Sequence, residues 1–178
     1  MKRRNSEKYI DHVIRIKGGI LMKYGLWAAK GVVFLLLIIL MLNVFSGPKM
    51  SKEDFGVVLS KVQENLDLSA LLQQDNQAIR KNLGLDPEAY ERIAYFKIDD
   101  VMQANEYVLV QFKDPDQKNA FQQAIESRIA EQTNLYDGYA PDQVQLLKQA
   151  VVDIQANYAL YVVDTNAKTM DEQFLESL

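Results

Sequence analysis

The chain has 178 residues, of which 48% are hydrophobic and 25% are charged, and its formal net charge is −4 at pH 7. This length allows one ordinary folded domain with an additional segment. The sequence contains no cysteine, which excludes disulfides, a thiolate nucleophile, cysteine metal sites and a lipid-modified cysteine anchor.

The charges are distributed unevenly. Residues 1–30 contain eight Lys or Arg and two acidic residues, whereas residues 31–178 contain 12 basic and 22 acidic residues, so the two parts carry +6 and −10. Such asymmetry indicates a membrane or nucleic-acid contact at one end of a chain. Because nucleic acid requires a basic face, we expect no nucleic-acid partner for the acidic part.

Residues 24–45 are almost entirely apolar and carry one charge, Lys30, near their start. A helix of this length spans roughly 33 Å, which is enough to cross a hydrocarbon core of about 30 Å. The sequence therefore predicts a single-pass signal anchor that contacts the lipid bilayer through 24–45. Cleavage after Ser46 is the alternative.

The basic flank sets the orientation of this predicted anchor. Residues 1–23 form a cytoplasmic tail in this interpretation, either a plain topology signal or a segment lying along the inner leaflet. Residues 46–50 are a linker, and residues 51–178 are an exported domain. We expect a cell-membrane location with the N-terminus cytoplasmic and the C-terminal domain outside.

Helical patterns open the exported domain. Ser51 is the expected N-cap of a first helix, in which Phe55, Val58 and Val62 recur on one apolar face. A second, short helix is predicted over 75–83 and ends at Gly84.

The period then alternates between strand and helix. Strands are predicted over 92–98, 106–112, 150–154 and 158–163, and helices over 114–132, 140–149 and 170–178. The predicted fold class is α+β: a four-stranded, mainly antiparallel sheet packed by helices.

The tripeptide Gln-Ala-Asn occurs at 103–105 and again at 155–157, each time before a strand. In three-residue hairpin loops Asn105 and Asn157 would adopt the left-handed conformation. Alignment of the copies matches Val108 with Leu160 and places them on equivalent faces. A ββα duplication and two hairpins that converged on one turn both fit this pattern.

Three tyrosines are the candidate partner surface. Strand parity places Tyr95, Tyr107 and Tyr161 opposite Val108 and Leu160. If helices cover only the latter face, the tyrosines are exposed together and suit a protein or glycan partner. If the N-terminal helices cover the tyrosine face, the three side chains are buried instead.

The acidic pair Asp99 and Asp100 lies close to a turn, where carboxylates are usually solvated, so a calcium or catalytic role is the weaker interpretation. Tyr136 and Tyr139 are expected to pin the connector between two helices. The only histidine, His12, lies in the predicted cytoplasmic tail, which excludes a Ser-His triad outside. We expect no catalytic, metal or cofactor-binding residues.

Three segments carry a resemblance to a known family: "VMQANEYVLVQFKD" (101–114), "YAPDQV" (139–144) and "AVVDIQANYALYVV" (150–163). The exported part resembles domain of unknown function 4358, most strongly over 91–164. The resemblance implies an extracytoplasmic location in a bacterium with a single-membrane envelope. It implies no activity and supplies no functional residues.

The sequence therefore predicts a membrane-anchored, non-catalytic interaction module with a protein partner in a bacterial envelope. The alternative is an exported ligand-binding or hydrolytic domain acting on envelope material, which requires a cleft lined by Asp99, Asp100 or the tyrosines. The oligomeric state stays open.

Overall fold

The computed structural model describes residues 50–178, together with Lys30, residues 32–35 and residues 37–38. The chain divides into two compact units, Met1–Gly47 and Pro48–Leu178. The described residues of the first unit are helical. Most of the predicted anchor 24–45, the tail 1–23 and nearly all of the linker 46–50 lie outside the described residues. Within the described ranges, no helix combines the length and the hydropathy that a membrane span requires.

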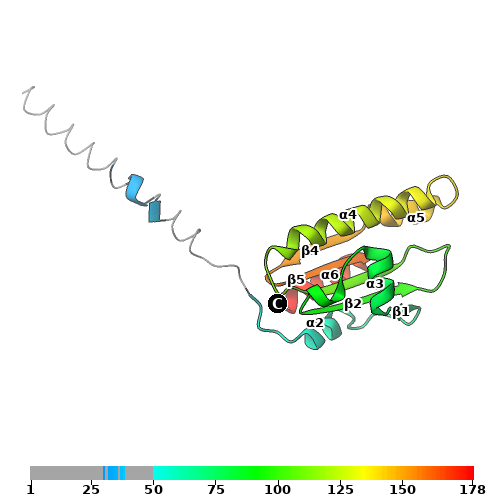
Figure 1. Ribbon diagram of the computed structural model, residues 1–178, viewed down its shortest axis with the longest axis horizontal. Helices are drawn as coiled ribbons and strands as arrows, with labels where there is room; N and C mark the ends of the chain where they lie inside the picture. Colours follow the sequence, from blue (N-terminus) through cyan, green and yellow to red (C-terminus); the bar gives the residue numbers. More distant parts are fainter. Residues whose placement is uncertain (1–29, 31, 36, 39–49) are drawn as a thin grey trace, which may run out of the picture. The chain divides into compact units, whose positions relative to one another are not determined.

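The second unit is an antiparallel sheet with helices on both faces (Figure 1). Its strands follow the order β1-β2-β3-β5-β4, and every neighbouring pair is antiparallel. The strands are β1 (Leu71–Gln73), β2 (Arg92–Ile98), β3 (Glu106–Gln111), β4 (Val151–Gln155) and β5 (Tyr158–Val163). The helices are α2 (Phe55–Val62), α3 (Asn76–Leu83), η1 (Pro87–Ala89), α4 (Gln117–Tyr136), α5 (Pro141–Lys148) and α6 (Ala167–Glu176).

The α+β class and the antiparallel sheet are confirmed, but the sheet has five strands where the sequence predicted four. The additional strand, β1, has only three residues and lies at the edge of the sheet, where Leu71 pairs with Ile98. Three residues are too few to show the alternation by which a strand is recognised.

The helix boundaries follow local capping chemistry. Asp54, rather than Ser51, caps α2, because its carboxylate accepts a hydrogen bond from the Gly56 N–H at 2.8 Å. The prediction for α3 is confirmed: Asp75 caps its start, and Gly84 ends it in the left-handed conformation with φ of 66°.

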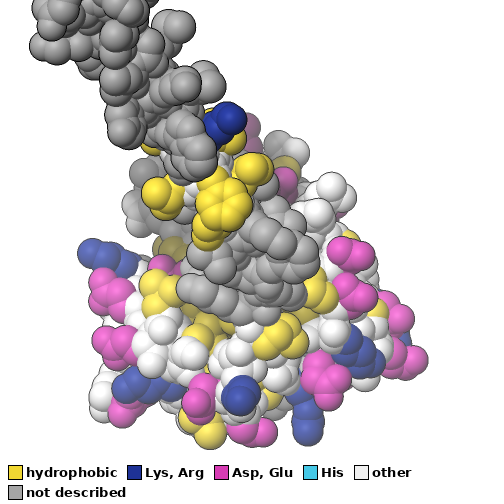
Figure 2. All heavy atoms as spheres, turned by 90° about the vertical axis from the view of Figure 1, so that its left-hand side faces the viewer, with side chains coloured by type: hydrophobic (Ala, Val, Ile, Leu, Met, Phe, Trp, Pro, Cys, Tyr) yellow, Lys and Arg dark blue, Asp and Glu magenta, His cyan; other side chains and the backbone are white. Residues whose placement is uncertain are grey.

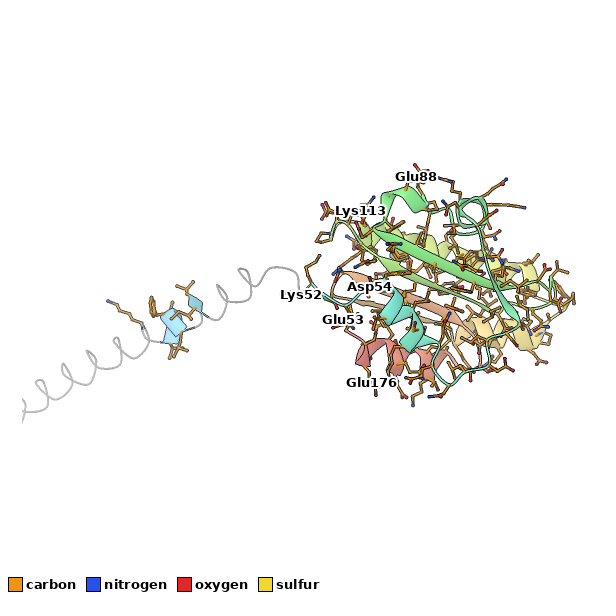
Figure 3. All side chains as sticks on the ribbon, turned by 90° about the horizontal axis from the view of Figure 1, so that it is seen from below. Lys52, Glu53, Asp54, Glu88, Lys113 and Glu176 are labelled. Atoms are coloured by element: carbon orange, nitrogen blue, oxygen red, sulfur yellow. The ribbon has the colours of Figure 1, made fainter. Side chains whose placement is uncertain are left out.

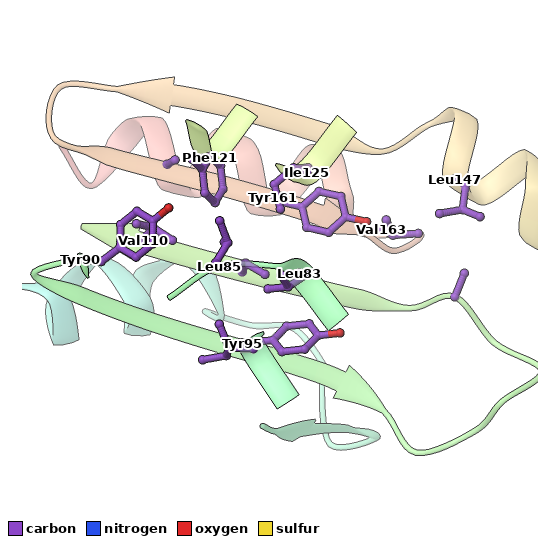
Figure 4. Close-up of a cluster of buried hydrophobic side chains, with 14 of the residues drawn as sticks. Leu83, Leu85, Tyr90, Tyr95, Val110, Phe121, Ile125, Leu147, Tyr161 and Val163 are labelled. Atoms are coloured by element: carbon purple, nitrogen blue, oxygen red, sulfur yellow. The ribbon is translucent and has the colours of Figure 1, made fainter. Parts of the chain in front are cut away.

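The first face of the sheet is covered by α3, α4 and α5. Tyr95, Val108 and Tyr161 face each other across β2, β3 and β5 in the strand register, so they lie on this face. Figure 4 shows this core between the sheet and the helices. Its further members are Leu83 from α3, Phe121 and Ile125 from α4, and Leu147 from α5.

The second face is covered by α2 and α6. Its core contains Val58 and Val62 from α2, Leu109 and Leu160 from the central strands, and Phe174 from α6, all fully buried. The predicted apolar stripe of the first helix is thereby confirmed. Both faces of the sheet are thus apolar and covered, which explains the near-continuous burial of β3 and β5.

The two Gln-Ala-Asn segments do not form equivalent turns. Residues 99–105 join β2 to β3 in a long loop, whereas residues 156–157 alone join β4 to β5. Among non-glycine residues of the described domain, positive φ values occur at Asn65 and Ala156. The prediction that Asn105 and Asn157 are left-handed is therefore wrong, and their side chains make long-range hydrogen bonds instead.

The topology also argues against a structural duplication. Val108 lies on the first face and Leu160 on the second, so the aligned copies do not keep their faces in step. The two ββα units, β2-β3-α4 and β4-β5-α6, differ in three ways. Their corresponding strands run in opposite directions, their first strands lie on opposite sides of their second strands, and their helices cover opposite faces of the sheet. No rotation reverses all three, so β2-β3-α4 and β4-β5-α6 have opposite hands.

The second core makes a specific prediction for α6. Replacing Phe174 by Ala should lower the free energy of unfolding by about 3–5 kcal/mol, because a fully buried ring is removed. Leu175→Ala is the matched control on the same helix: its side chain is 48% exposed, and a change within about 1 kcal/mol is expected. Denaturant unfolding of both variants measures the difference. Equal losses would contradict the assignment of α6 to a core.

Candidate functional site

The structure buries all three tyrosines of the predicted partner surface. Tyr95 and Tyr161 lie beneath α3 and α4 on the first face, and Tyr107 lies on the second face, where it stacks on Phe96 with 4.6 Å between ring centroids. Of the two alternatives that the sequence left open, the shared, exposed tyrosine face is therefore wrong on two counts, and the burial of the three side chains is confirmed. Both faces carry helices, and the register of β3 separates Tyr107 from the other two.

Tyr95 and Tyr161 instead converge on a buried carboxylate, Glu106, at the start of β3. Their hydroxyls donate to Glu106 Oε2 and Oε1 at 2.7 and 2.9 Å. Arg128 of α4 donates from Nε to Oε1 at 2.9 Å and from Nη2 to Oε2 at 2.8 Å. Each carboxylate oxygen thus accepts two hydrogen bonds. We call these four residues the Glu106 network.

Strand register explains the position of the network. Glu106 and Val108 are two residues apart and lie on the same face, while Val108 has Tyr95 and Tyr161 as its neighbours on β2 and β5. Figure 4 shows the two rings with their hydroxyls directed toward the same end of the sheet. The tyrosines therefore reach Glu106 from both sides, and α4 supplies the cation from above.

The surroundings of the network raise the pKa of both tyrosines and of Arg128. Burial and the neighbouring Glu106 raise the pKa of Tyr95 and of Tyr161, so both hydroxyls remain protonated and continue to donate. Burial alone would lower the pKa of Arg128, but its hydrogen bonds to Glu106 and the carboxylate charge outweigh burial and raise it. Because Glu106 has no free acceptor position, the network is structural in character.

The sequence analysis missed Glu106 and Arg128, although a signal for each is present. In "EYVLV" the period of two places Glu106 on the same face as Val108 and Val110. In α4, Arg128 lies three residues after Ile125, on the same apolar side of the helix. A charge on each of two apolar faces indicates a buried ion pair.

The other predicted features lie in turns. Asp100 accepts hydrogen bonds from the Met102 N–H and from Gln103 Nε2, and the turn bonds lower its pKa. Within the part of the chain that the structure describes, no group of three or more His, Asp or Glu side chains is arranged to hold a metal ion. Tyr136 does pin its connector, through bonds to the carbonyls of Val101 and Gln103 at 3.2 and 2.8 Å, whereas half of Tyr139 is exposed.

The loop 99–105 and the corner between α4 and α5 lie together at one end of the sheet. Besides the Tyr136 bonds, Gln143 of α5 accepts from the Ala104 N–H at 2.9 Å. Large apolar side chains at this end are between 50% and 81% exposed. We call them the tip patch: Val101, Met102, Leu135 and Tyr139.

A polar pocket of about 290 Å³ lies between α3 and α4, next to the Glu106 network. The end of α3 contributes Lys81, Asn82, Leu83 and Gly84, and α4 contributes Ala124, Ser127, Arg128 and Glu131. Arg128 thus belongs both to the buried network and to the wall of this α3–α4 pocket.

These features define the class of protein: an antiparallel α+β domain that is covered on both faces and has a buried ion pair between its central strand β3 and the helix α4. Residues 64–164, more than half of the chain, match the family model "Domain of unknown function (DUF4358)". The chain belongs to this family, as the resemblance predicted. No curated protein and no solved structure matches the chain.

The family match contains the Glu106 network, the tip patch and the α3–α4 pocket, but neither α2 nor α6. The compact unit Pro48–Leu178 is therefore larger than the matched region. Without α2 and α6, the core of the second face, including Leu109 and Leu160, would be open to water.

The Glu106 network predicts strong coupling between its two charges. Glu106→Gln and Arg128→Met should each lower the free energy of unfolding by about 3–5 kcal/mol, because each leaves a buried group without its partner. The double variant should lose about 1–3 kcal/mol less than the sum of the single losses. Denaturant unfolding of the four proteins completes the cycle.

The exposed pair Arg80–Asp86, at 2.9 Å, provides the control for this cycle. Arg80→Met and Asp86→Asn should change stability by at most about 1 kcal/mol, since water solvates both charges when they are separated. A coupling for Glu106 and Arg128 that is no larger than this surface value would contradict a central role for the network.

Proposed function

We propose that this protein is a single-pass, membrane-anchored interaction module on the outer side of a bacterial envelope, and that its tip patch binds a protein partner. The proposal joins two lines of support. The hydropathy and flanking charge of residues 24–45 support the anchor and its orientation. The position of the tip patch within the domain supports the partner surface.

The observation that carries the proposal is the separation of the two ends of the sheet. The backbone N–H of Ser51, the beginning of the domain, donates to the Asn157 side chain in the β4–β5 turn at 2.7 Å. The Tyr158 hydroxyl fastens the next residues by donating to the Glu53 carbonyl at 2.7 Å. We call this end of the sheet, where residues 51–53 contact the β4–β5 turn, the entry end.

The strand register places the tip patch at the opposite end. Gln111, the last residue of β3, pairs with Tyr158 at the entry end, whereas Glu106, its first residue, follows the loop 99–105. Six residues of β3 separate the two ends by roughly 20 Å. A domain tethered through Ser51 therefore presents Val101 and Tyr139 on the side away from its tether.

The entry end carries both charged and apolar side chains, and Met50 and Leu175 are 54% and 48% exposed there. Figure 3 shows charged side chains at the entry end, and basic and acidic groups alternate around the rim of that face in Figure 2. The labelled charges in Figure 3 are Lys52, Glu53, Asp54, Glu88, Lys113 and Glu176. The tip combines the four apolar side chains of the tip patch with the exposed carboxylates of Asp99 and Asp137. An apolar partner surface with a basic rim complements it.

The alternative function, a hydrolytic or ligand-binding site lined by Asp99, Asp100 or the tyrosines, has less support. The two cores bury the side chains of Tyr95, Tyr107 and Tyr161, so these tyrosines cannot line an open cleft. The Asp100 carboxylate already accepts a hydrogen bond from the Met102 N–H within its own turn. We therefore propose a module without catalytic chemistry.

The first prediction from this proposal concerns topology. Because the chain has no cysteine, a single introduced thiol reports on one position. In intact protoplasts a membrane-impermeant maleimide should label Lys168→Cys, whose side chain is 89% exposed on α6. Lys8→Cys should react only after permeabilisation, since it lies in the basic tail. The reverse labelling pattern would overturn the orientation.

The second prediction concerns the tip patch. A photo-crosslinking residue at Val101 or Tyr139, in intact cells, should give the same discrete adduct with one protein of the envelope, because both positions lie in the contact. Gln122, exposed on α4 and outside the tip patch, is the control position and should not give this adduct.

A charge variant tests the same surface without altering the core. Tyr139→Lys should abolish the adduct formed from position 101, while the free energy of unfolding falls by no more than about 1.5 kcal/mol, because half of the ring is already in water and its contact with the Tyr136 ring is lost. Adducts that persist in the Tyr139→Lys chain, or that form equally from position 122, would count against the tip as the partner surface.

A further inference from the structure

The α3–α4 pocket contains a guanidinium that is fixed in place and only partly used. Arg128 spends its Nε–H and one Nη2–H on Glu106. A guanidinium carries five N–H donors. In the described domain the other three have no protein acceptor, and Arg128 lines the pocket. The pocket therefore has a preoriented cationic donor in its wall.

The fixation of Arg128 matters for binding. Its side chain is 8% exposed, and the two bonds to Glu106 hold the plane of the guanidinium. A ligand that accepts from the remaining N–H groups does not have to immobilise a flexible side chain, which is the usual entropic cost of recruiting a surface arginine. Planar guanidinium donors match the two oxygens of a carboxylate.

Two further charges of opposite sign line the same pocket. Lys81 lies near the end of α3 and Glu131 lies on α4, one turn beyond Ser127, and no ion pair joins the two across the pocket. Because Glu106 already neutralises Arg128, the charges left for a ligand are one positive and one negative. This balance disfavours a simple anion, which Glu131 repels, and favours a ligand that carries both signs.

The dimensions limit the ligand further. A volume of about 290 Å³ lies just below the range for ligand pockets, about 300–1,000 Å³, so the ligand must be small. Gly84 has no side chain and Ala124 has only a methyl group, so neither fills the pocket that it lines. No atom lies within 4 Å of the position that a Cβ at Gly84 would occupy. The space suits a molecule of amino-acid size.

We propose that the α3–α4 pocket binds a small zwitterion of the amino-acid class. Its carboxylate accepts from Arg128 and Lys81, and its ammonium group donates to Glu131. This site is separate from the tip patch and does not depend on the proposed partner. It adds to the interaction module a small-molecule ligand beside its central ion pair.

The test is a titration of the full chain, ¹⁵N-labelled and held in detergent micelles, followed through its backbone amide signals. The probes are L-alanine, which carries both charges, and acetate and ethylammonium, which carry one each. L-Alanine should shift the amides of residues 81–84 and 124–131 saturably below about 10 mM, since even a Kd of about 1 mM corresponds to measurable binding. Acetate and ethylammonium should each bind at least about tenfold more weakly, a difference of about 1.4 kcal/mol.

Two matched variants assign the charges. Glu131→Gln should reduce L-alanine binding to the level of acetate while leaving acetate binding unchanged or stronger. Glu126→Gln removes an exposed acid from the same helix outside the pocket and should alter neither. Both positions are exposed, so neither change should disturb the core.

Three results would overturn the proposal. The first is the absence of saturable shifts with L-alanine, and the second is a set of shifts that maps outside the two helices. The third is equal affinity for acetate and L-alanine in the native chain, which would identify an anion site only. These outcomes are independent of the topology and crosslinking experiments, since they concern other residues and another face of the domain.

Discussion

The carboxylate of Glu106 joins the central elements of this domain. Through four hydrogen bonds it connects β3, on which it lies, to β2 by Tyr95, to β5 by Tyr161 and to α4 by Arg128. Burial of an ion pair brings little net stability, because desolvation offsets the attraction between the charges. The buried ion pair instead favours one strand register over others. Any register that moves Glu106 away from Arg128 leaves a charge in the core without a partner, so one pairing of β2, β3 and β5 is favoured over its neighbours.

The two-sided sheet follows from the same strands. The strands β3 and β5 are apolar at both odd and even positions, so exposing either face of the sheet to water would be unfavourable. Each face therefore requires its own layer of helices. The helices α3, α4 and α5 cover one face from within the family match. The helices α2 and α6 cover the other from outside it. The folding unit is therefore set by the need to bury Leu109 and Leu160, and it extends beyond the region by which the family is recognised.

The strand direction separates two ends of the domain. The Ser51–Asn157 hydrogen bond fixes the start of the domain to the β4–β5 turn, and the β2–β3 loop lies at the other end of the same strands. Apolar exposure gathers at the second end, where Tyr136 holds the loop 99–105 against the α4–α5 corner. This separation of the start of the domain from the exposed apolar end is the arrangement on which the proposed interaction module rests.

The sequence by itself determined the local elements, because helices and strands are encoded by short-range periods and caps: the α3 boundaries at Asp75 and Gly84, the strands β2 and β5, and the family were all readable. Tertiary structure decided which face each strand presents. Parity within one strand is local, but whether Tyr107 shares a face with Tyr95 depends on the register between strands, which the 99–105 loop sets. It also decided the candidate sites. Glu106 and Arg128 are 22 residues apart, and only the packing of α4 across the sheet turns two isolated charges into one network beside a pocket.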